Sequence, residues 1–124
     1  MKINAMALKS LLAATLGMTV IAGAADSPRV TVEGYVLDSA CAFTKGLKTP
    51  ISQECATSCA SAGSQLVILA TDGKIYWPIA DTTPSSGQNA KLLPFAGERV
   101  TASGKIYNRG GSTAIVIEKI EAQK

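Results

Sequence analysis

Segments that alternate between apolar and polar residues constrain the fold of this chain more than any other feature. Residues 30–37 (VTVEGYVL) and 98–107 (ERVTASGKIY) alternate with a period of two, which predicts strands with one buried face. Gly34 interrupts the first strand and indicates a bulge or a sharp bend, a device by which small barrels close. The positions expected to face inward are Val30, Val32, Gly34, Val36, Val100, Ala102, Gly104 and Ile106.

Three more strands are predicted in the rest of the chain. Residues 65–71 (QLVILAT) form a continuous apolar run of strand length, and an Asp-Gly turn connects them to a returning strand at 74–80. Residues 113–121 (TAIVIEKIE) form the last strand. Its alternation slips between Ile117 and Ile120, which indicates a bulge.

Helical structure is expected to be limited. We interpret residues 38–53 as a loop, followed by a short helix with Ser52 as its N-cap and Gly63 just after its end. A single helical turn is expected within residues 89–96. Its apolar residues, expected to pack on one end of the sheet, are Leu92, Leu93 and Phe95.

Five short strands predict an all-β fold with one short helix. A chain of this length removes exposed strand edges best by closing the sheet. We therefore expect a five-stranded antiparallel barrel similar to the oligonucleotide/oligosaccharide-binding (OB) fold. An open five-stranded sheet covered by the helix is the alternative.

The first 24 residues have the pattern of a secretory signal peptide. Two lysines precede an uncharged apolar segment at 10–21, and Ala-Gly-Ala at 22–24 fits a cleavage site. The alternative is a membrane anchor, but the uncharged stretch is shorter than the ~20 residues that a spanning helix needs. The sequence thus predicts an exported protein, periplasmic or secreted, whose OB-like domain comprises residues 25–124.

Composition excludes several classes of function. The chain has no histidine, which excludes Ser-His-Asp and Cys-His catalysis and every histidine-ligated metal site. Removal of Lys2 and Lys9 with the leader lowers the net charge from +3 to +1, without a basic cluster. We therefore expect no nucleic-acid binding, no membrane contact after signal cleavage and no enzymatic activity.

The three cysteines are the main candidate site. Cys55 and Cys59 are four residues apart on the predicted helix and share one face, and Cys41 follows the first strand. In an oxidising compartment, a disulfide from Cys41 to Cys55 or Cys59 is the first interpretation. Closing a loop of this length stabilises a fold by roughly 3 kcal/mol.

Two other interpretations of the cysteines remain open. The three thiolates, together with Asp38, can hold copper(I) or zinc, although no fourth strong ligand is evident without a histidine. Alternatively, the protein is a thiol redox protein. Cys55 lies in the first turn of its helix, where the helix dipole lowers the pKa of a thiol.

Four segments in this order resemble a family of small exported bacterial OB-like domains of unknown function. Its pattern combines GxxxDxxC, a histidine, CxxxC, a DGKxY hairpin and AGxxVxVxG. The segments that carry the resemblance are 34–41 (GYVLDSAC), 55–63 (CATSCASAG), 66–79 (LVILATDGKIYWPI) and 95–107 (FAGERVTASGKIY). The family's histidine would fall between Cys41 and Cys55, where this chain has none. The resemblance implies an exported OB-like domain and no established activity.

Aromatic residues indicate a second candidate site. Tyr76 and Trp77 lie on the predicted hairpin, and together with Tyr107 they can form a stacking platform for a sugar or a peptide. The alternative is that Trp77 closes one end of the barrel. The first functional hypothesis is therefore a non-catalytic module, stabilised by a disulfide, that binds an unknown protein or small molecule.

Overall fold

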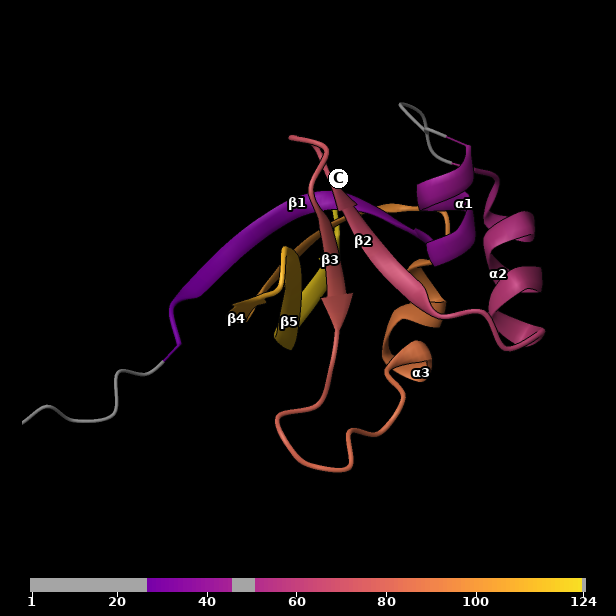
Figure 1. The fold of residues 1–124 in the computed structure, drawn as a ribbon. Coiled ribbons are helices and arrows are strands. Elements are labelled where there is room, and N and C mark those ends of the chain that lie inside the picture. Colours follow the sequence, from indigo (N-terminus) through magenta and orange to yellow (C-terminus); the bar gives the residue numbers. More distant parts are fainter. Residues whose placement is uncertain (1–26, 46–50, 124) are drawn as a thin grey trace, which may run out of the picture.

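The computed structural model describes residues 27–45 and 51–123, and the predicted signal peptide lies outside these residues. Five strands form a closed barrel in the order β1-β2-β3-β5-β4 (Figure 1), which confirms the expected OB-like all-β fold. The strands are β1 (Arg29–Asp38), β2 (Leu66–Ala70), β3 (Ile75–Pro78), β4 (Arg99–Arg109) and β5 (Ser112–Ala122).

One strand pairing differs from the expected antiparallel barrel. β3 and β5 run parallel, with Tyr76 opposite Thr113 and Pro78 opposite Ile115, whereas the other four pairings are antiparallel. The cause is the long connection from β3 to β4, which crosses one end of the barrel. β4 can then pair with β1, and β5 returns from β4 in the same direction as β3.

β1 belongs to both halves of the barrel because it changes partner along its length. It pairs with β4 up to Tyr35 and with β2 from Gly34 onward. A Cβ atom at Gly34 would lie 2.8 Å from the Cα of Ala70, so only glycine permits this approach. The bulge expected near the end of the chain is also confirmed, because the β4–β5 register skips Glu118.

The barrel interior contains the predicted apolar positions. Val30 is half-buried, and the other predicted inward positions are buried. A second buried cluster covers the outer face of the sheet, with Leu37, Cys41, Ala42 and Val67 at its centre. Partly buried side chains around it are Tyr35, Ile51, Leu69, Ile75 and Trp77.

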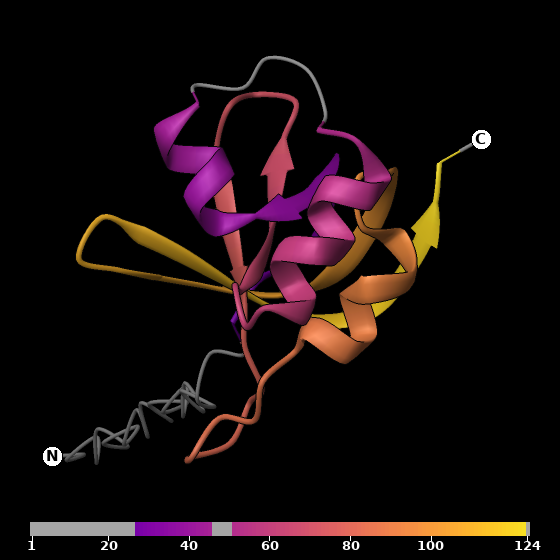
Figure 2. The ribbon, with the colours of Figure 1, turned by 90° about the vertical axis from the view of Figure 1, so that its right-hand side faces the viewer.

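Two helices lie next to each other beside one end of the barrel (Figures 1 and 2). α2 (Gln53–Ser61) is the predicted helix, and Gly63 after it has the positive φ of 102° expected of a helix end. α1 (Ser39–Thr44) corrects the expectation of a loop over 38–53. Asp38 caps this short helix, and Cys41 and Ala42 bury its inner side against the outer sheet cluster.

The predicted helical turn before β4 is confirmed as α3 (Asn89–Leu92) and the 3₁₀ helix Leu93–Phe95. Leu92 is fully buried against the barrel core, and Phe95 packs partly against it. Leu93 was expected to pack there as well, but it is exposed. Among the described residues, no helix has the length and apolar character needed to span a membrane.

Candidate functional site

The strongest candidate site lies where β1 ends and the two neighbouring helices begin to cover the sheet. Asp38 is the last residue of β1, and Cys41 lies one turn later in α1. Cys59 comes from α2. A carboxylate oxygen of Asp38 and the sulfurs of Cys41 and Cys59 all lie within 4.8 Å of one another.

Asp38 is held in place by the start of α1. Its Oδ1 accepts a hydrogen bond of 3.1 Å from the backbone N–H of Cys41, the geometry of a helix N-cap. The side chain is buried, with the whole residue 2% exposed. Asp38 is thus the N-cap of α1, and this cap holds its carboxylate beside the Cys41 thiol.

α2 supplies the other two thiols from one face. Ser52 caps this helix by accepting a hydrogen bond of 3.1 Å at Oγ from the backbone N–H of Cys55. Cys55 and Cys59 lie one helical turn apart, and the distance between them is 4.3 Å. All three cysteines are free thiols in the structure, so the proposed disulfide stays a prediction.

Gly97 determines where the first turn of α2 lies. Its φ is 76°, which favours glycine, and a Cβ atom there would lie 2.6 Å from the Cα of Gln53. The backbone N–H of Gly97 donates to the carbonyl of Val36 at 2.7 Å, which joins this turn to β1. The start of α2 therefore packs against a turn that is hydrogen-bonded to β1, the strand that carries Asp38.

Burial and a neighbouring negative charge raise the pKa of two of the three thiols. Burial raises the pKa of Cys41, and the negative charge of Asp38 raises it further. Desolvation and Asp38 likewise raise the pKa of Cys59. Cys41 is buried, whereas Cys55 and Cys59 are partly exposed, so the cluster is reached from solvent over α2.

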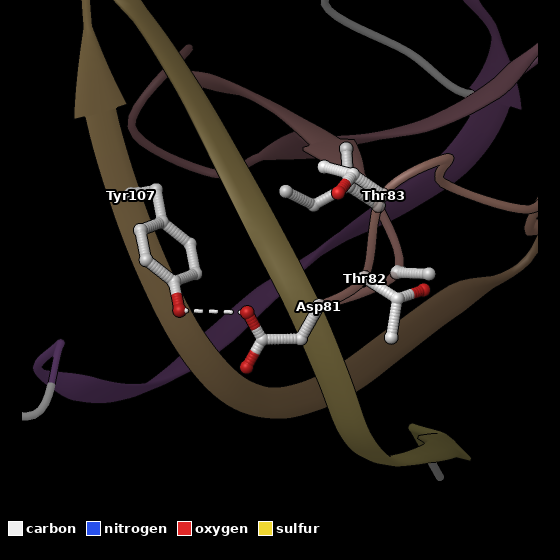
Figure 3. Close-up of a pocket in the computed structure, with 6 residues that line it drawn as sticks. Asp81, Thr82, Thr83 and Tyr107 are labelled. Carbon is white, nitrogen blue, oxygen red and sulfur yellow. Dashed lines mark hydrogen bonds between the residues drawn. The ribbon is translucent and has the colours of Figure 1, made fainter.

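The three aromatic residues predicted as one platform do not share a surface. Tyr76 packs toward the barrel core, whereas its neighbour Trp77 packs on the outer sheet cluster. This position also corrects the alternative that Trp77 closes a barrel end. Tyr107 lines a separate hollow of about 340 Å³ and donates its hydroxyl to Oδ1 of Asp81 at 2.9 Å (Figure 3). Lys105 also donates to Asp81, at 3.1 Å.

Phe43 is a partner of Trp77 that the sequence does not indicate. The ring of Phe43, on the outer side of α1, stacks on that of Trp77 with centroids 5.9 Å apart and planes inclined by 30°. The two rings line a groove of about 330 Å³ that continues to the β2–β3 and β4–β5 turns. Phe43 remains 62% exposed. No glycine or proline interrupts residues 38–44, so the sequence allows a helix there, but nothing in the sequence indicates the contact of Phe43 with Trp77.

Comparisons with known proteins give no match to a family model, to a curated protein or to a solved structure. The resemblance to exported OB-like domains therefore stays a prediction.

Proposed function

We propose that the protein binds a thiophilic metal ion, zinc or copper(I), through Cys41, Cys59 and Asp38, with Cys55 as a further ligand. The observation that carries the proposal is the buried carboxylate of Asp38, which lies against two sulfurs. The proposal assigns a binding role and keeps the prediction that the protein is not an enzyme.

A buried carboxylate needs a compensating charge. Removing an anion from water costs several kcal/mol unless a cation or several hydrogen bonds offset the loss of hydration. The three ion pairs among the described residues involve other carboxylates. A metal ion between Asp38 and the two sulfurs would supply that positive charge.

The donor atoms lie slightly farther apart than in a zinc site, and a small inward movement of the side chains would bring them into range. Tetrahedral zinc has bonds of ~2.3 Å to sulfur, which separates its sulfur ligands by about 3.8 Å. The donor atoms of Asp38, Cys41 and Cys59 lie within 4.8 Å of one another, so rotation of side chains supplies the remaining approach. Cys55 is close enough to Cys59 to take the fourth position.

Binding would release protons, because the ligand is the thiolate. Burial and Asp38 raise the pKa values of Cys41 and Cys59, so an ion must displace protons that these thiols hold at neutral pH. We therefore expect apparent affinity to increase with pH.

Native mass spectrometry of the reduced protein, with zinc or copper(I) added in separate samples, tests the proposal. We expect one ion per chain and protection of the thiols from alkylation. Cys41→Ser and Cys59→Ser should lose the ion, whereas Ser58→Ala, on the exposed side of α2, should retain it. Failure of the reduced wild-type protein to bind either ion would refute the proposal.

The disulfide remains a competing role for the same residues. Cys41 and Cys59 lie on different helices with their sulfurs within 4.8 Å, so a bond between them would tie α1 to α2. Intact mass distinguishes the two roles: a protein isolated without reductant that is lighter by about two mass units and binds no ion after reduction supports the disulfide alone.

A second function rests on the groove beside Phe43 and Trp77. We propose that it binds a small ligand, because an exposed aromatic ring stacked over a hollow of about 330 Å³ suits stacking against a planar or sugar ring. Titration with monosaccharides and aromatic amides, read by the fluorescence of Trp77, tests this function. An unchanged emission across both series would count against it.

A further inference from the structure

We propose that Asp38 tunes the metal preference of this site, by serving as a ligand for a divalent ion of the zinc type and contributing little to the binding of copper(I). This inference rests on the proposed ion-binding function and names the class of ion. It follows from the donor atoms, from their charge and from the way in which the fold holds Asp38.

The donor set lacks the soft neutral ligands that favour copper(I). Copper(I) prefers thiolates and thioethers, whereas zinc accepts carboxylate oxygen together with thiolate sulfur. The three methionines of the chain, Met1, Met6 and Met18, all lie in the predicted signal peptide, and the chain has no histidine. A carboxylate therefore stands where a copper(I) site would carry another sulfur.

Charge points in the same direction. With Asp38 and two thiolates as ligands, a divalent ion leaves one net negative charge, whereas copper(I) leaves two. The thiolate of Cys55 would add one more negative charge in either case. Because Asp38 and Cys41 are buried, the extra uncompensated charge of a monovalent ion is costly there.

The fold presents this carboxylate in a fixed orientation. Oδ1 accepts the backbone N–H of Cys41, which is the one hydrogen bond that the described residues give to the Asp38 side chain. The cap thus holds one oxygen, and the other accepts no hydrogen bond from the described residues. The same hydrogen bond fixes the position of Cys41. The start of α1 and the proposed ion site therefore depend on one contact.

This double role allows the carboxylate to be removed while the cap is kept. Asn and Ser cap helices about as well as Asp does, so Asp38→Asn and Asp38→Ser retain the acceptor for Cys41 N–H but lose the negative ligand. Asp72→Asn is the matched control. Asp72 is exposed, and its Oδ1 accepts a local backbone N–H from Lys74, so the same change of charge occurs away from the site.

The test measures the dissociation constants of zinc and of copper(I) for each variant by competition with a chromophoric chelator for that ion. We expect Asp38→Asn and Asp38→Ser to raise the dissociation constant for zinc by about tenfold to a hundredfold or more. The dissociation constant for copper(I) should change less than about threefold, since copper(I) relies on the thiolates. Asp72→Asn should leave both constants unchanged.

Two outcomes would overturn the inference. A parallel loss of both ions would assign Asp38 a structural role only, and unchanged zinc binding would remove it from the ligand set. Asp38→Ser and thermal melting of the ion-free variants separate loss of folding from loss of a ligand. If the wild-type protein binds neither ion, the proposed function itself fails, and this inference fails with it.

Discussion

Substituting Gly97 by alanine should move α2 and weaken the ion site from a distance. The new Cβ atom would lie 2.6 Å from the Cα and 2.8 Å from the N of Gln53, so the first turn of α2 must shift. Two costs add at this position. A φ of 76° costs an alanine about 1–2 kcal/mol, and overpacking against backbone costs about 1–3 kcal/mol more.

Gly63→Ala provides the matched control for this experiment. Gly63, at the other end of α2, also has a positive φ, of 102°, but a Cβ atom there would have nothing within 4 Å. It should therefore show the backbone cost alone. Urea unfolding of the ion-free protein gives the free energy of unfolding, and ion competition gives the affinity.

We expect Gly97→Ala to lose about 1–3 kcal/mol more stability than Gly63→Ala. It should also bind the ion more weakly, because Cys55 and Cys59 move with α2, whereas Gly63→Ala should retain the wild-type affinity. Equal destabilisation of the two variants, or an unchanged ion affinity in Gly97→Ala, would refute the argument that Gly97 positions the site.

Two further predictions concern the rest of the molecule. Hydrogen bonds from Tyr107 and Lys105 lower the pKa of Asp81, so its stabilising contribution is present above the unfolded-state pKa of ~3.9 and is lost as pH falls through the lower folded-state value. At neutral pH, Asp81→Asn should therefore have a lower melting temperature than the wild-type protein. At about pH 2 the two melting temperatures should be equal, and a difference that persists in acid would contradict this linkage. Ion binding should change the emission of Trp77 in the wild-type protein but not in Phe43→Ala, because Phe43 lies on the helix that carries a ligand. An equal change in both proteins would show that α1 does not transmit ion binding to Trp77.

The barrel could be predicted largely because its strands follow simple patterns. Period-two alternation identified the buried positions of β1 and β4, such as Val36 and Val100. The parallel pairing of β3 with β5 could not be predicted, because it depends on where a long connection crosses the barrel. Alternation also places Tyr76 and Trp77 on opposite faces, so the expected aromatic platform conflicted with the strand pattern itself.

The candidate site was predictable in part. The spacing of Cys55 and Cys59 and the cap at Ser52 place two thiols on one face of α2. The approach of Cys41 depends on α1, a helix of six residues that is too short to be stable alone. Its cap at Asp38 and its packing on the outer sheet cluster stabilise it, and this packing has no signal in the local sequence.

X-ray absorption at the zinc edge tests the central claim most directly, because it reports the atoms bound to the ion. For the reduced, zinc-loaded protein we predict sulfur neighbours at ~2.3 Å together with an oxygen neighbour at ~2.0–2.2 Å. A spectrum with oxygen neighbours alone would contradict the assignment of the ion to Cys41, Cys59 and Asp38.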